Sequence, residues 1–151
     1  ITTVTLSSAE LVENKVKKNK NIHHRFFPVD IKFLIKKFLL MWKPKKIFLV
    51  DSEIWPNLIL SSKEMKIPIS LLNARITKKT FSRWMLVHNF AKRIFSSLEM
   101  CLASNLESEN HLKILGARNV VCTGNIKLIL LVINMRILLT QDQESQQKQI
   151  S

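Results

Sequence analysis

Short uninterrupted apolar runs alternate along this chain with longer segments whose apolar residues have helical spacing. The four-residue run Ile47–Val50 is typical of a central strand that is buried on both faces of a parallel sheet. Strands are predicted over 1–6, 47–50, 68–72, 100–103 and 120–123. Helices are predicted from 7 or 8 to about 18, then over 31–42, 56–65, 77–97 and 105–115.

Several predicted helices have recognisable boundary residues. A polar side chain can accept a hydrogen bond from the first turn, proline fits the first turn, and glycine fits the residue after the last one. The expected boundary residues are Asp30, Pro56, Thr77, Ser104 or Asn105, and Gly116. Thr77 is expected to cap one long helical stretch that continues to about Ser97.

This alternation of strands and helices predicts an α/β fold, a Rossmann-like parallel sheet with helices on both faces. Ligands of such folds bind at the carboxyl ends of the strands. The polar residues and the glycine predicted at those ends are Asp51, Ser52, Glu53, Asn73, Arg75, Ser104, Gly124 and Asn125. This edge of the sheet is therefore where we expect the functional site.

The last 24 residues do not continue the pattern. Residues 128–139 are mostly apolar, and a glutamine-rich polar stretch follows. No cap or turn signal joins this tail to the preceding elements. We therefore expect one partial domain over 1–127 and an aberrant or disordered tail over 128–151.

The charge balance points to an anionic partner. Twenty-four basic and 11 acidic residues give a net charge of +13 within a chain that is 46% hydrophobic. Nucleic acid, a membrane surface and a phosphorylated substrate are the candidates. Basic clusters lie beside aromatic residues, which suits an anionic membrane interface. They would also suit nucleic acid, but no nucleic-acid-binding motif is present, and a solvated face is the default for any single cluster. Biased coding in an AT-rich genome would also produce a lysine surplus.

Neither a metal site nor a membrane span is expected. Cys101 and Cys122 are too isolated for a metal motif and are expected to be small buried residues in a reducing cytoplasm. The adjacent His23 and His24 would lie in a solvated loop. No apolar stretch reaches the roughly 20 residues that a spanning helix needs, and no signal peptide is visible.

Two groups at the predicted strand ends could carry chemistry. Asp51 and Glu53 precede a helix start, where they could orient a sugar hydroxyl or support a general base. They could equally be part of a capped helix start. Arg75 could bind a phosphate or carboxylate with two hydrogen bonds, or it could pair with Glu53 or Asp51.

Five segments, in order, resemble the 3-deoxy-D-manno-octulosonic acid (Kdo) transferase family. Asp51–Ile59 is similar to that family's acidic-x-Glu-Ile-Trp-Pro-Asn signature. The four weaker segments are Ile1–Thr5, Phe26–Asp30, Asn73–Thr77 and Gly124–Lys127. Together they cover residues 1–127.

The resemblance implies a two-domain glycosyltransferase of the GT-B type that moves Kdo from CMP-Kdo to the lipid A precursor in lipopolysaccharide biosynthesis. This chain would be part of the amino-terminal domain, which binds the acceptor. The enzyme would lie at the cytoplasmic face of the bacterial inner membrane, and CMP-Kdo would bind only with the carboxyl-terminal domain present. The implied substrate-binding residues are Glu53, Asn73, Arg75 and Lys127, with Glu53 also supporting catalysis. The family's catalytic glutamate would precede residue 1. No cofactor, metal or nucleic acid is implied.

The tail departs from the family. Leu128 and Ile129 follow Lys127 where the family continues with an aromatic residue and aspartate, so an out-of-frame tail is one hypothesis. We expect the chain alone to be inactive as a transferase. Two alternatives are a non-catalytic basic module that binds anionic membrane or glycolipid, and a barely stable remnant whose sheet lacks a strand.

Overall fold

The computed structural model describes residues 1–4, 6, 9–10 and 22–126. They belong to two compact units, residues 1–43 and 44–151, which are described separately. The described strands form parallel pairs, and helices connect the strands of the second unit, so the predicted α/β class is confirmed. The predicted helix up to residue 18 falls mostly outside the described residues. Lys127 and the tail over 128–151 lie wholly outside them.

The first unit contains a short parallel pair and one helix. Strand β1 (Thr2–Thr3) pairs with β2 (Arg25–Phe26), and helix α2 (Lys32–Trp42) follows. The predicted strand over 1–6 is thus only two residues long, because β2 offers it only two partners. Asp30 is not the helix cap: the N-cap residue is Ile31, which has no side-chain cap.

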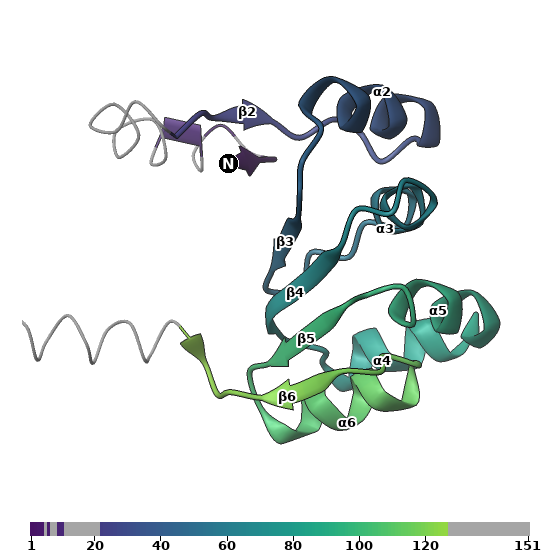
Figure 1. Ribbon diagram of the computed structural model, residues 1–151. Helices are drawn as coiled ribbons and strands as arrows, with labels where there is room; N and C mark the ends of the chain where they lie inside the picture. The colour runs from purple at the N-terminus through teal and green to yellow at the C-terminus, as the bar shows by residue number, and fades with distance from the viewer. Residues whose placement is uncertain (5, 7–8, 11–21, 127–151) are drawn as a thin grey trace, which may run out of the picture. The chain divides into compact units, whose positions relative to one another are not determined.

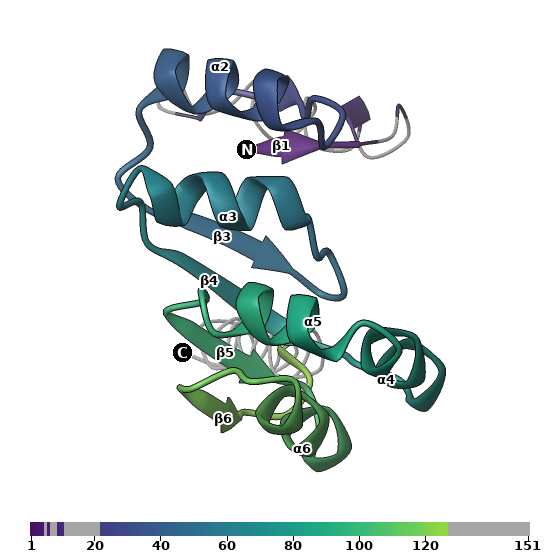
Figure 2. The ribbon, with the colours of Figure 1, turned by 90° about the vertical axis from the view of Figure 1, so that its right-hand side faces the viewer.

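The second unit is a four-stranded parallel sheet in the order β3-β4-β5-β6. Because each strand is added on the same side of the previous one, right-handed crossovers place the connecting helices on one face. Figure 1 shows this face covered by helices, and Figure 2 looks onto it. The prediction placed helices on both faces, whereas the described helices of this unit lie on one. The elements are β3 (Ile47–Val50), α3 (Pro56–Glu64), β4 (Ile69–Ala74), α4 (Lys78–Met85), α5 (His88–Phe95), β5 (Met100–Ala103), α6 (Leu106–Ile114) and β6 (Val120–Cys122).

The prediction that Ile47–Val50 is a central strand buried on both faces is wrong. Among the strands that the structure describes, β3 lies at the edge of this sheet and has β4 as its one partner. Leu49 is buried, but Phe48 is 55% exposed and Val50 48% exposed. The unbroken apolar run therefore reflects one covered face only. β4 is the more central strand, and five of its six residues are buried.

The core of this unit lies between the sheet and its helices. Its largest fully buried side chains come from strands, helices and the residues that follow them: Ile59, Ile69, Leu71, Ile76, Ile94, Phe95, Leu112 and Leu115. Burying a side chain of this size contributes about 1.5–3 kcal/mol. The sheet and the helices α3, α5 and α6 are thus a common support for the loops at the strand ends.

The single helix predicted over 77–97 is two helices, α4 and α5, which are interrupted at Leu86–Val87. Neither proline nor glycine marks the break. α5 packs Ala91, Ile94 and Phe95 into the core, whereas α4 buries no residue completely. The break lets each helix follow its own packing partner, which local sequence patterns cannot reveal.

Most of the other predicted helix boundaries are confirmed. Thr77 accepts a hydrogen bond from Thr80 N at the start of α4, and Asn105 accepts one from Ser108 N at the start of α6. Pro56 is the first residue of α3. Gly116 follows α6 with φ 101°, a conformation that suits glycine.

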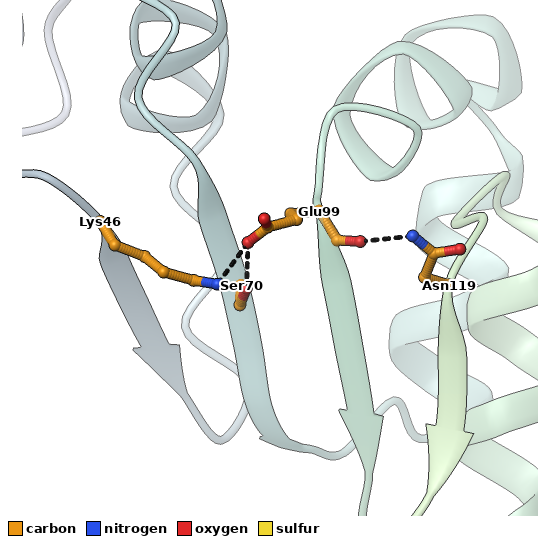
Figure 3. A network of polar contacts seen from close by, with 4 residues as sticks. All are labelled: Lys46, Ser70, Glu99 and Asn119. Atoms are coloured by element: carbon orange, nitrogen blue, oxygen red, sulfur yellow. Dashed lines mark hydrogen bonds and ion pairs between the residues drawn. The ribbon is translucent and has the colours of Figure 1, made fainter.

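The amino ends of the strands are joined by a polar network (Figure 3). Lys46 Nζ lies 2.5 Å from Glu99 Oε2, and Ser70 Oγ donates to the same oxygen at 3.2 Å. Asn119 Nδ2 donates to the Glu99 backbone oxygen at 2.8 Å. The Lys46 hydrogen bond, the largest influence, lowers the pKa of the Glu99 carboxyl below its ordinary value. We call these four residues the amino-edge network.

Candidate functional site

The loops that follow the strands meet at the carboxyl edge of the four-stranded sheet. The loop after β3 is tied to β4 by two hydrogen bonds: Asp51 N donates to Leu72 O at 2.9 Å, and Ser52 Oγ donates to Arg75 O at 2.7 Å. Two of the polar segments singled out in the sequence, 51–53 and 73–75, therefore lie side by side, as expected for neighbouring parallel strands.

Asn73 joins three parts of this edge. Its Nδ2 donates to Asp51 Oδ1 at 2.5 Å, and its Oδ1 accepts a hydrogen bond from Ile126 N at 3.1 Å. Its side chain is nearly buried, with 7% of the residue exposed. The amide thus connects the loop after β3 to the chain that follows β6, and both its ends are engaged within the protein.

Two non-glycine residues at this edge have left-handed backbone conformations. Asp51 has φ 62° and Asn73 has φ 53°. Asp and Asn tolerate this region better than other non-glycine residues, yet it still carries a conformational cost. Strained backbone held by surrounding contacts is concentrated at functional sites, which supports the carboxyl edge as the candidate site.

Glu53 and Arg75 differ from Asn73, since both are exposed. In the part of the chain that the structure describes, Arg75 forms no ion pair with either Glu53 or Asp51. The structural pairing considered for Arg75 is therefore not observed. A guanidinium in this position is available to an anionic ligand, and the Glu53 carboxylate is available to a hydroxyl group.

The backbone next to Arg75 is fixed from the side of α6. Ile76 N donates to Ser108 Oγ at 2.9 Å, and His111 Nδ1 donates to Ile76 O at 2.8 Å. The His111 ring also stacks on Phe81, with 4.3 Å between centroids. In the sequence His111 was an isolated helical histidine, and nothing in its spacing indicated this role. Ser108 was likewise missed.

The remaining strand-end residues complete the edge. Ser104 N donates to Ala74 O at 2.9 Å, while the Ser104 hydroxyl is buried without a hydrogen-bond partner. Gly124 has φ 76°, and a Cβ added there would lie within 4 Å of no atom beyond its chain neighbours. Thus the loops after β5 and β6 reach the same edge as Asn73.

The histidines and cysteines lie elsewhere. His24 Nε2 is hydrogen-bonded to Thr3 Oγ1 at 2.8 Å in the first unit. Cys101 is buried within β5, and desolvation raises the pKa of its thiol to about 12. Cys122 is half-buried, contrary to the expectation of full burial. The described residues contain no group of three or more His, Cys, Asp or Glu residues able to hold a metal ion.

Comparison with known sequences now fixes the family. A family model described as 3-deoxy-D-manno-octulosonic-acid transferase (kdotransferase) matches residues 1–130. The chain belongs to the Kdo transferase family. Both segments that form the core of the site, 51–53 and 73–75, lie within the matched range, so the carboxyl edge belongs to the family's amino-terminal module.

Three relatives show how far the similarity extends. A probable mitochondrial Kdo transferase of Arabidopsis thaliana is 40% identical over 84 residues, 56% of this chain. The Kdo transferase of Rickettsia typhi is 34% identical over 96% of this chain. That of Haemophilus influenzae is 28% identical over 83% of this chain. The Rickettsia typhi match omits only a few residues, so it extends into 128–151. The chain spans 18% to 30% of the length of these relatives.

None of the helices formed by the described residues is both long and apolar enough to cross a membrane.

Proposed function

We propose that this chain is the acceptor-side part of an enzyme that transfers Kdo from CMP-Kdo to the lipid A precursor. The observation that carries the proposal is the exposed pair Glu53 and Arg75, held on neighbouring loops of one sheet edge within a Kdo transferase module. The Rickettsia typhi and Haemophilus influenzae relatives are Kdo transferases by name. The acceptor's phosphate groups suit the charge of +13.

Each residue of the candidate site has its own proposed role in acceptor binding. Arg75 binds a phosphate of the acceptor, because its guanidinium is exposed and forms no ion pair with Glu53 or Asp51. Glu53 accepts a hydrogen bond from a sugar hydroxyl and supports the reacting group. Asn73 keeps the two loops in register. Lys127, outside the described residues, is proposed as a second acceptor-binding cation.

The proposed reaction of the whole enzyme is an inverting displacement that uses neither metal nor cofactor. A base deprotonates the acceptor hydroxyl, its oxygen bonds to the anomeric carbon of Kdo, and cytidine monophosphate leaves. By the resemblance, the base would be a family glutamate outside this chain, and CMP-Kdo would bind in the carboxyl-terminal domain. We place the enzyme at the cytoplasmic face of the bacterial inner membrane.

This chain alone is proposed to bind acceptor without transferring Kdo. The test is incubation with CMP-Kdo and the lipid A precursor, followed by mass spectrometry of the glycolipid. No Kdo-bearing product is expected from the isolated chain. Such a product would refute the proposed inactivity, while failure to bind the precursor in detergent micelles would refute the acceptor-side assignment.

A second candidate function is a non-catalytic module that binds anionic membrane or glycolipid. The observation in its favour is the excess of basic over acidic residues, 24 against 11. A precursor stripped of its phosphates separates the two: the acceptor-side assignment predicts residual binding through the sugar hydroxyls, whereas a purely electrostatic module loses binding altogether.

A further inference from the structure

The segment 74–98, which includes α4 and α5, carries positive charge only. It contains no Asp or Glu, and its six basic residues are all exposed. In the described part of the chain, none of the six takes part in an ion pair. They are Arg75, Lys78, Lys79, Arg83, Lys92 and Arg93. An unneutralised set of this size on one segment attracts an anionic surface.

The turn between α4 and α5 adds exposed apolar side chains to this charge. Leu86 is 86% exposed, the highest value among the large hydrophobic residues that the structure describes. Met85, Val87 and Phe90 are 38%, 50% and 40% exposed. We call these four residues the apolar tip.

Leu86 is not needed to attach the two helices, whereas Phe90 of the tip stacks on Trp84 of α4, with 6.5 Å between ring centroids. α5 is held by Ala91, Ile94 and Phe95, which are fully buried. On α4, Phe81 stacks on His111, and Trp84 contacts Phe95 edge-on at 5.4 Å between centroids. Other side chains therefore attach the helices to the rest of the unit. Packing within the described residues does not require an apolar side chain at Leu86.

The apolar tip lies at the end of α4, the helix that follows the candidate site in the chain. α4 begins three residues after Arg75, and Figure 2 shows it beside the carboxyl ends of the strands. The tip and the loop that carries Arg75 are thus joined by the single eight-residue helix α4.

We propose that the apolar tip enters the interfacial region of an anionic lipid bilayer while the six basic residues contact its headgroups. Apolar side chains with basic neighbours are what such an interface binds. The inference rests on the proposed function for its choice of a bilayer, and it extends that function by naming the docking surface. Nucleic acid would attract the same lysines but would leave Leu86 in water.

Sedimentation of the full chain with phospholipid vesicles tests this. Vesicles containing phosphatidylglycerol, but no glycolipid, are compared with neutral phosphatidylcholine vesicles. Leu86→Ser is expected to weaken binding to the anionic vesicles about tenfold, from the apolar area it removes. Its matched control is Leu106→Ser on α6, where leucine is 70% exposed; the control should bind like the unchanged chain.

The charge contribution is tested in the same way. Lys78→Gln with Lys79→Gln should weaken anionic binding and reduce its salt dependence. Lys63→Gln with Lys66→Gln, which removes two exposed lysines near the end of α3, should have a smaller effect. Circular dichroism confirms that each variant is folded.

Three results would overturn the docking proposal: unchanged vesicle binding by Leu86→Ser, equal binding to neutral vesicles, or equal losses for Leu86→Ser and Leu106→Ser. Duplex DNA binding that is as tight as vesicle binding and insensitive to Leu86→Ser would assign the basic segment to nucleic acid instead. Because the vesicles lack glycolipid, the two proposals can fail separately. A chain that binds vesicles but not the precursor in micelles contradicts only the proposed function. A chain that binds the precursor but not the vesicles contradicts only the docking surface.

Discussion

The two ends of the four-stranded sheet use polar residues in opposite ways. At the amino end, Lys46 and Glu99 neutralise each other, and Ser70 and Asn119 hydrogen-bond to Glu99. At the carboxyl end, the buried Asn73 is fully engaged, while the charged Glu53 and Arg75 remain exposed.

This difference separates structural polar groups from candidate functional ones. A charge already paired within the protein has little left to offer a ligand, since a ligand would have to displace its partner. An exposed guanidinium on a well-held loop has no such competitor. We therefore expect the amino edge and Asn73 to contribute to stability, and we propose Arg75 and Glu53 as the ligand-binding residues.

The largest effect is expected from Asn73→Ala. It removes both side-chain hydrogen bonds and leaves alanine with φ 53°, so the free energy of unfolding should fall by about 3 kcal/mol. Urea unfolding followed by circular dichroism measures this. Asn73→Gly removes the same bonds without the left-handed strain and should lose about 1 kcal/mol less. An equal decrease in the free energy of unfolding for the two variants would contradict the claim that the backbone at Asn73 is strained.

The next effect concerns binding rather than stability. Arg75→Gln should weaken binding of the lipid A precursor about tenfold, since a charged hydrogen bond to a phosphate contributes about 1.5–3 kcal/mol. Unfolding should be nearly unchanged, because Arg75 is exposed. Arg118→Gln, at an exposed position just before β6, makes the same change near the amino edge. Equal affinity of both variants for the precursor in a micelle titration would contradict the proposal that the carboxyl edge, and not the amino edge, binds the acceptor.

A smaller effect is expected from Ser52→Ala. The variant loses the hydrogen bond to Arg75 O that joins the two site loops, so unfolding should become easier by about 0.5–1 kcal/mol. Precursor affinity should also decrease, because the loop that carries Arg75 is less well held. Ser82→Ala, at an exposed position on α4, is the control. Equal melting temperatures for the two variants would contradict a stabilising role for the hydrogen bond from Ser52 to Arg75.

The smallest effect is expected at the amino edge. The folded-state pKa of Glu99 lies below its ordinary value of 4.5, so its contribution to stability is present above pH 4.5 and is lost as the pH falls through the folded-state pKa. Glu99→Gln should therefore be slightly less stable than the unchanged chain at pH 7 and equal to it in strong acid. Added salt should reduce the difference at pH 7, because the pair is exposed. A difference that grows toward low pH would contradict this assignment.

The sequence predicted the elements of the second unit well because their signals are local. Thr77 and Asn105 cap their helices through side chains only three residues from their partners, and Gly116 supplies a backbone conformation that other residues disfavour. The acidic and Asn-Ala-Arg segments were placed at one edge because parallel strands must align their carboxyl ends. Family membership followed from the order of the motifs.

Three features depended on contacts between residues far apart in the chain. The edge position of β3 is set by its pairing with β4 alone, which four apolar residues do not reveal. The break at Leu86 follows from the separate packing of α4 and α5. His111 reaches Ile76 across 35 residues, so no spacing rule could connect them.

The sequence by itself determined the parallel α/β class, the family and the set of polar residues at the strand ends, since short-range periodicity and motif order encode them. Only the tertiary structure decided which of those polar residues the protein itself engages. Asn73 is held by atoms of two other loops, whereas Arg75 projects from a loop held at its backbone. Hydrogen-bond partners are chosen by proximity in space, and proximity in space is what the fold adds to the sequence.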